Sequence, residues 1–138
     1  MKEKTLSSKL RMRPHQQVLI LNAPEGYLMT LGELPEGVTV TTAAEPPDVA
    51  AGTFDFVHLF VRSQAELVRW APVVLGAVVF DGSLWISYPK KSSGIVTDIS
   101  RDVGWEPLAE AGMRPVFQVS IDDTWSALRY RPGSRVGT

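Results

Sequence analysis

The sequence predicts an α/β fold of three layers, in which helices cover both faces of a mostly parallel sheet of about six strands. Two observations predict it. Short apolar runs of strand length alternate with segments of helical periodicity, which is typical of parallel sheets. Two further strand-like runs end the chain on either side of a short turn, which predicts an antiparallel C-terminal hairpin. The 138 residues suit a single domain with one core.

The predicted strands follow from apolar runs bounded by proline, glycine and aspartate. The first and third runs are apolar almost throughout, as expected of strands buried on both faces. The last two runs are joined by the turn from Asp122 to Trp125. The six expected strands are residues 17–22, 38–42, 54–61, 83–88, 116–121 and 126–130.

The main predicted helix begins after Ser63, because Glu66 stands three residues later at the spacing of a capping box. Its apolar face continues to Val78, and Asp81–Gly82 are expected to end it. Pro72 lies inside this segment, and we expect it to kink the helix or to begin a second one.

Two other helices are expected. One or two turns fit residues 27–31. A later helix is predicted to be capped by Thr97 or Asp98 and to run to about Ala111, with a break near Trp105–Glu106 caused by Pro107. The resulting order of elements resembles the methyltransferase-like variant of the Rossmann-like fold, with one β-α unit missing in the middle. We expect residues 10–132 to form the domain, and residues 1–9 and 133–138 to be flexible.

Composition excludes several classes of function. The formal net charge of −1 gives no reason to expect nucleic-acid or membrane-surface binding. The absence of cysteine excludes disulfides and thiolate metal sites, and two histidines exclude a histidine-rich metal site. The N-terminus lacks the apolar core of a signal peptide, and the longest apolar run is shorter than the roughly 20 residues of a membrane span. We therefore expect a soluble cytoplasmic protein.

A cationic loop directly follows the fourth predicted strand. Residues 84–88 are strand formers that end at Pro89, and the next five residues are Lys90, Lys91, Ser92, Ser93 and Gly94. Ligands of open parallel sheets bind beyond the carboxyl ends of the strands. The loop, together with the N-terminus of the helix expected near Thr97, predicts a site for an anionic small molecule carrying a phosphate or a carboxylate. The alternative is that both lysines pair with the acidic residues Asp98, Asp102, Asp122 or Asp123.

Two other segments reach the same rim of the predicted sheet. If the strand order follows methyltransferases, they meet the lysine loop in one crevice. Each also has a structural alternative, as a turn or as packing. The candidate ligand-binding residues of these segments are Asn22, Glu25, Gly26 and Tyr27 after the first strand, and Asp122, Asp123, Trp125 and Ser126 at the hairpin.

The first of these segments disfavours S-adenosylmethionine as a cofactor. A nucleotide-binding loop needs several glycines for close approach of its backbone, and only Gly26 is present. Thr41 and Thr42 stand where an acidic ribose ligand is expected after the second strand, with Glu45 further on. His58 lies in the middle of a strand and is expected to be a hydrogen-bonded core residue rather than a base.

The motifs in residues 21–27, 54–61, 84–94, 97–98, 101–105 and 122–129 resemble a bacterial family of uncharacterised proteins labelled domain of unknown function 3052. The resemblance covers about Leu10 to Pro132. His15 stands where that family has glycine. The resemblance implies a Rossmann-like, methyltransferase-like fold and no activity.

The sequence leaves three functions open. The first is a domain that binds an anionic small molecule at the carboxyl-end rim without a recognisable catalytic constellation. The second is an S-adenosylmethionine-dependent methyltransferase with an atypical cofactor loop. The third is a protein interaction module, in which the apolar segment Val73–Phe80 contacts a partner or a second copy of the chain. The sequence identifies no catalytic residue and no metal ligands.

Overall fold

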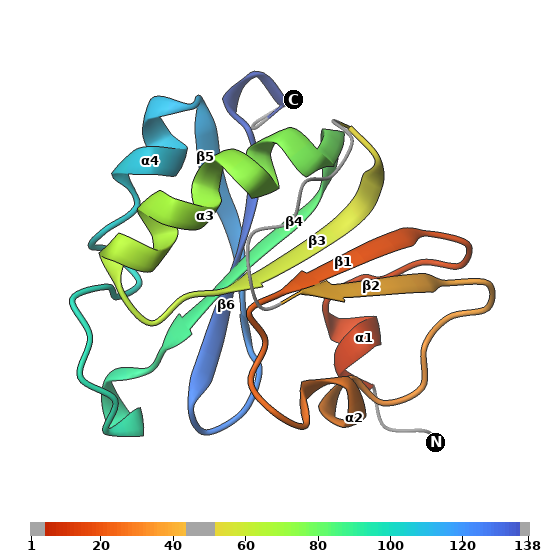
Figure 1. Cartoon of the computed structure of the whole chain (residues 1–138), viewed down its shortest axis with the longest axis horizontal. Coiled ribbons are helices and arrows are strands. Elements are labelled where there is room, and N and C mark those ends of the chain that lie inside the picture. Colours follow the sequence, from red (N-terminus) through yellow and green to blue (C-terminus); the bar gives the residue numbers. More distant parts are fainter. Residues whose placement is uncertain (1–4, 44–51, 136–138) are drawn as a thin grey trace.

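The structure, a computed structural model, describes residues 5–43 and 52–135. Within these residues, one six-stranded mixed sheet has the order β2-β1-β3-β4-β6-β5, and helices lie on both of its faces (Figure 1). This confirms the predicted α/β class. The strands are β1 (Gln17–Leu21), β2 (Thr39–Ala43), β3 (Phe54–Phe60), β4 (Val78–Pro89), β5 (Met113–Ser120) and β6 (Trp125–Pro132).

The first four strands are parallel, and the last two are not. β1 pairs in parallel with β2 on one side and with β3 on the other, so the chain changes direction across the sheet at the β1–β3 boundary. β6 is antiparallel to β4, and β5 is antiparallel to β6. The predicted C-terminal hairpin is thereby confirmed, and β6 lies inside the sheet while β5 forms its edge.

The core has two layers, one on each face of the sheet. Side chains alternate between the two faces along β1. Leu19 and Leu21 lie in the layer covered by α3 (Gln64–Ala77), and Val18 and Ile20 lie in the other layer. The second layer also contains buried residues of α1 (Leu6–Lys9) and α2 (Tyr27–Leu31). We call these two sides the α3 face and the α1/α2 face.

The helix α3 begins as predicted but ends earlier than expected. The Ser63 Oγ accepts a hydrogen bond from the backbone N–H of Glu66 at 3.1 Å. Pro72 lies within one continuous helix, so no second helix begins there. Val78 already pairs with Phe54 as the first residue of β4, and the register of these strands then shifts. Val73–Phe80 is therefore helix up to Ala77 and strand from Val78 onward. Self-association through it stays a prediction.

The helix expected from Thr97 or Asp98 is absent from the described residues, and α4 spans only Glu106–Glu110. Both polar side chains instead bond the start of α3. Asp98 Oδ1 accepts from the Gln64 N–H at 2.8 Å, and Thr97 Oγ1 donates to the Arg62 carbonyl at 2.6 Å. Pro107 lies in the first turn of α4, where a missing N–H costs no helical hydrogen bond.

Short helices occupy parts of both predicted flexible ends. α1 is capped by the Thr5 side chain, and Leu6 at its start is buried. Gly133–Arg135 form a 3-10 turn after β6. None of the helices in the described part of the chain is long and apolar enough to cross a membrane.

Candidate functional site

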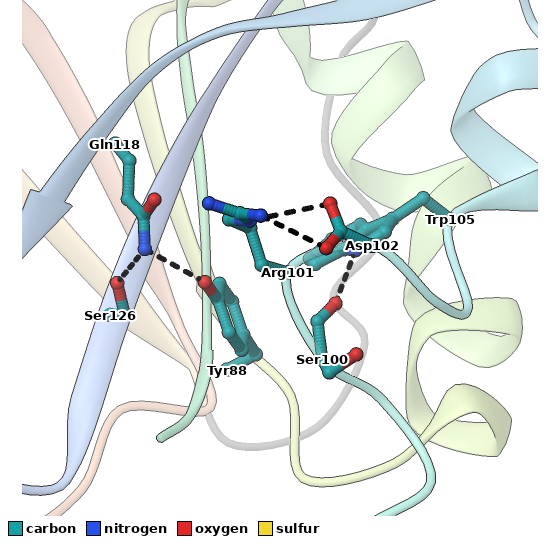
Figure 2. Close-up of polar contacts among 7 residues, drawn as sticks. All are labelled: Tyr88, Ser100, Arg101, Asp102, Trp105, Gln118 and Ser126. Carbon is teal, nitrogen blue, oxygen red and sulfur yellow. Dashed lines mark hydrogen bonds and ion pairs between the residues drawn. The ribbon is translucent and has the colours of Figure 1, made fainter. Parts of the chain in front are cut away.

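A cavity of about 360 Å³ opens at the carboxyl-end rim of the sheet, on the α3 face. Figure 2 shows those of its side chains that come from β4, β5, β6 and the segment that precedes α4, without the two lysines. The residues that matter for binding are Tyr88, Lys90, Lys91, Arg101, Gln118 and Ser126.

Hydrogen bonds between neighbouring strands fix one wall of the cavity. Tyr88 of β4 and Ser126 of β6 are directly paired in the sheet, and both are buried. Gln118 of β5 donates from Nε2 to the Tyr88 hydroxyl at 3.1 Å and to Ser126 Oγ at 3.0 Å (Figure 2). This wall is polar and internally hydrogen-bonded, and it presents hydroxyl and amide groups to the cavity.

The two lysines form no ion pair with any described carboxylate. Lys90 Nζ donates to Ser120 Oγ at 2.7 Å, and the Lys90 backbone N–H donates to the Thr124 carbonyl at 2.8 Å. Lys91 is exposed at the start of the 3-10 turn Lys91–Ser93. The alternative in which nearby aspartates neutralise the lysines therefore does not hold for the described residues.

The aspartates considered for that role have other partners. Asp98 bonds the start of α3, and Asp102 pairs with Arg101 at 3.1 Å. Asp122 Oδ1 accepts from the backbone N–H groups of Thr124 and Trp125, both at 2.8 Å, which is an aspartate turn. Asp123 is exposed in the same turn.

Arg101 is a third cation at the cavity, and sequence reasoning missed it. Figure 2 shows its side chain lying between Tyr88 and Asp102. The hydrogen bond with Asp102 raises the pKa of the Arg101 guanidinium above its usual value. Trp105 Nε1 donates to the Ser100 carbonyl at 2.7 Å, which holds this segment against the sheet. The sequence predicts a helix over these residues, in which the Arg101 side chain would point in a different direction, and so it did not place Arg101 at the cavity.

The predicted site residues do not meet in one crevice. Lys90, Lys91 and Ser126 line the cavity, whereas Trp125 is buried on the α1/α2 face against Phe60, with ring centroids 5.2 Å apart. Tyr27 belongs to that same face. The alternation of side chains along β6 explains the separation of two residues that are adjacent in sequence.

The remaining predicted residues belong to turns at the same rim. Asn22 Nδ2 donates to the Phe60 carbonyl at 2.9 Å and to Glu66 Oε1 at 3.3 Å, which ties the end of β1 to the end of β3. Glu25 and Gly26 are exposed in the loop that follows Asn22. Ser92 and Ser93 lie in the 3-10 turn, where Ser93 Oγ accepts from the Ile95 N–H, and Gly94 ends that turn in a left-handed conformation.

His58 is a core residue, as predicted. Its Nδ1 is bonded to the Tyr27 hydroxyl, and its Nε2 lies 2.6 Å from Ser87 Oγ. Burial lowers the pKa of His58 to about 3, so its ring is neutral near pH 7. Burial also raises the pKa of the Tyr27 hydroxyl above its usual range. Tyr27, His58 and Ser87 thus form a buried hydrogen-bonded chain of side chains within the α1/α2 face.

No protein-family model and no curated protein matches the sequence, so the resemblance to domain of unknown function 3052 stays a prediction. Solved structures do match. An S-adenosylmethionine-dependent methyltransferase from Aquifex aeolicus has 15% identity and a TM-score of 0.57, over 89% of this chain and 85% of that one. The 1,6-didemethyltoxoflavin-N1-methyltransferase of Burkholderia thailandensis, solved with S-adenosylhomocysteine, has 14% identity and a TM-score of 0.59, over 92% and 74%. A ribosomal protein L11 methylase from Lactobacillus delbrueckii has 13% identity and a TM-score of 0.60, over 92% and 74%.

The TM-scores of 0.57 to 0.60 over most of the chain establish a methyltransferase-like fold. The matches also correct one prediction: the disfavouring of S-adenosylmethionine was wrong, because the neighbours include methyltransferases that depend on this cofactor and one that holds its product. The prediction assumed that the loop after β1 needs several glycines. Asn22 has a φ of 57° and Gly26 a φ of 84°, so asparagine supplies one of the left-handed turns. Glu45, which bears on the ribose argument, lies outside the described residues.

Proposed function

We propose that this chain is an S-adenosylmethionine-dependent methyltransferase that acts on an anionic small molecule. The observation that carries the proposal is the sheet topology. The strand order reverses direction between β1 and β3, and the sheet ends in a reversed β5–β6 hairpin. In open α/β sheets, ligands bind beyond the carboxyl ends of the strands at such a reversal.

The cofactor would lie against the loop after β1. A Cβ atom added at Gly26 would meet no heavy atom within 4 Å, so the backbone there is open to a ligand. Asn22 and Glu66 join the ends of β1 and β3 and fix the position of this loop. Glu66 Oε1 also accepts from the Arg62 N–H at 2.7 Å. When bound, S-adenosylmethionine supplies an electrophilic methyl group on a positively charged sulfur.

The acceptor would lie in the cavity between the end of β4 and the segment that precedes α4. Lys90, Lys91 and Arg101 bring three positive charges to it, against one carboxylate from Asp102. Cations in a cleft attract an anion and raise its local concentration. The wall of Tyr88, Gln118 and Ser126 then orients the acceptor by hydrogen bonds, because its polar groups are already held in place. The role of these residues is binding and orientation.

Isothermal titration calorimetry with S-adenosylmethionine and S-adenosylhomocysteine tests the cofactor step. We expect saturable binding of both by the unmodified chain. Gly26→Leu fills the open approach and is expected to abolish binding. Gly112→Leu is a matched control, because Gly112 has a φ of 86° and equally open surroundings but lies beyond α4. Both variants carry a similar cost of about 1–2 kcal/mol for a side chain at positive φ. Absence of binding to the unmodified chain, or equal loss in both variants, would refute the proposal.

A second candidate is a domain that binds an anionic small molecule without methyl transfer. The observation that favours it is the pair of lysines without a described carboxylate partner. This candidate predicts that phosphorylated or carboxylated compounds raise the melting temperature, and that Lys90→Gln with Lys91→Gln removes the shift. A ligand at 100 times its dissociation constant adds about 2.7 kcal/mol of stability. The two candidates separate on whether S-adenosylmethionine binds as well.

A further inference from the structure

A second cavity, of about 380 Å³, lies at the opposite, amino-end rim of the sheet. It is formed by the segment between α1 and β1, by the starts of β3 and β4, and by β6. None of its lining residues lines the cavity beside Lys90. The residues that decide its chemistry are Arg11, Arg13, Asp55, Asp81, Ser83 and Arg129.

Arg129 contributes a donor that the described chain leaves without a partner. It stands on β6 directly opposite Trp85 of β4, and its side chain is half-buried. Its Nε is buried and forms no hydrogen bond with any described residue. A buried donor without an acceptor costs about 1–3 kcal/mol. Arg129 lines the cavity, so a movement of its side chain that brings Nε to an acceptor on a bound ligand would be stabilising.

Arg11 and Arg13 are held near this donor by their backbone. Trp85 Nε1 donates to the carbonyl of Leu10 at 3.1 Å, and the N–H of Arg13 donates to Gln16 Oε1 at 2.9 Å. The guanidinium of Arg11 lies 4.4 Å from the centre of the Phe117 ring. Burial, and then repulsion from Arg131, lowers the pKa of Arg129, and attraction to Asp81 partly opposes this. Arg11 and Arg13 add smaller repulsions, as expected of charges that line one cavity.

The two acids of this cavity already have partners. Asp81 accepts from Arg131 at 2.9 and 2.8 Å in a two-pronged pair, and Arg135 lies 3.4 Å from the same carboxylate. Asp55 Oδ2 accepts from the backbone N–H of Gln17 at 2.8 Å. Five arginines thus face two aspartates among the described residues of this rim, which leaves an excess of three positive charges.

We propose that the cavity bounded by Arg11, Arg13 and Arg129 is a binding site for the phosphate group of a small organic molecule. Guanidinium groups bind phosphate oxygens through paired, charge-assisted hydrogen bonds. A doubly charged phosphate matches the excess of positive charge better than a single carboxylate does. The cavity exceeds the size of a phosphate ion, and Ser83 and Val79 line the space left for an organic group. This site lies at the other end of the strands from the proposed methyl transfer.

Titration of the ¹⁵N-labelled chain with inorganic phosphate at constant ionic strength tests the site, because the Nε–H groups of arginine give separate NMR signals. We expect the Arg129 signal to shift and to saturate. Arg13→Gln, at an exposed position, is expected to weaken phosphate binding about tenfold without loss of fold. Arg69→Gln is the matched control, since it removes an exposed arginine from α3, and it should change the dissociation constant less than twofold.

Three further arms complete the experiment. Lys90→Gln with Lys91→Gln should leave the shift of the Arg129 signal unchanged, because these lysines lie at the other rim. Succinate at equal ionic strength should bind more weakly than phosphate, and equal binding would overturn the phosphate assignment. A short duplex oligonucleotide that shifts the same signal at lower concentration than phosphate would show a nucleic-acid site instead. No shift of the Arg129 signal, or equal weakening by Arg13→Gln and Arg69→Gln, would overturn the proposal.

Discussion

Two polar residues on the α1/α2 face of the sheet, His58 and Arg129, have opposite surroundings. His58 of β3 is fully buried, and both of its ring nitrogens have hydroxyl partners, on Tyr27 and Ser87. Arg129 of β6 is half-buried, and its Nε has no partner among the described residues. The comparison teaches that burial alone does not separate a structural polar group from a ligand-binding one, whereas the hydrogen bonds already made do.

The neighbouring elements cause the difference. The helix α2 places Tyr27 against His58, and the His58 ring stacks on Phe60 with centroids 4.4 Å apart. Arg129 faces the segment between α1 and β1, which brings two more arginines and no free acid. The ring nitrogens of His58 therefore find their hydrogen-bond partners within the protein. Arg129 instead has an unpaired Nε and a positive charge at a cavity, where a ligand could pair with them.

The largest effect on stability is expected for His58, which links Tyr27 to Ser87 by hydrogen bonds. His58→Ala removes the ring and leaves the hydroxyls of Tyr27 and Ser87 buried without partners. We expect it to lower the free energy of unfolding by about 3–4 kcal/mol, from the cavity and the two lost hydrogen bonds. Urea denaturation with a two-state fit measures this.

His58→Gln is the matched variant, because its amide keeps a donor and an acceptor at similar reach. It is expected to cost about half as much as His58→Ala. If both substitutions cost less than about 1 kcal/mol, the chain of three side chains contributes little to stability and the contrast with Arg129 is lost.

The next effect is a pH dependence that only the buried histidine produces. The pKa of His58 is about 3 in the folded chain, against about 6.5 when unfolded. Between these values the unfolded chain binds a proton that the folded chain does not, so stability falls as the pH drops below about 6.5. Between pH 7.5 and pH 5 we expect a loss of about 2 kcal/mol.

Denaturant unfolding at several pH values checks the sign. The range from pH 7.5 to 5 lies above the ordinary pKa of carboxylates, so their contribution there is small. His58→Gln should remove most of the slope. An unchanged slope in that variant would assign the pH dependence to other groups.

The fold was predictable because its signals are local. The apolar runs of β1 and β3, and the Ser63–Glu66 spacing at the start of α3, each specify one element within a few residues. The boundary of α3 and β4 was not predictable in this way, since valines after Ala77 suit either a helix face or a strand. The helical turns expected between Thr97 and the predicted break near Trp105–Glu106 do not form, because Asp98 instead accepts from Gln64, which is distant in the sequence.

The two rims show the same limit for sites. Lys90 and Lys91 are adjacent in the sequence and follow a strand, so a cationic loop could be predicted, and both line a cavity. Arg11, Arg13 and Arg129 come from opposite ends of the chain, and only the pairing of β6 with β4 brings them together. Single-sequence reasoning finds a site whose residues are contiguous, and it misses one that is assembled by strand pairing.

The smallest effect is the one that separates Arg129 most sharply from His58. Arg129→Met keeps the apolar stem of the side chain and removes the buried donor, together with its repulsion from nearby arginines and its attraction to Asp81. In phosphate-free buffer we expect the free energy of unfolding to stay equal or to rise by about 1 kcal/mol, because nothing in the described chain loses a partner. Phosphate at 100 times its dissociation constant should then stabilise the unmodified chain by about 2.7 kcal/mol and leave the variant unchanged, which reverses their order in thermal unfolding. A loss of more than 1 kcal/mol without phosphate would mean that Arg129 is a structural residue like His58.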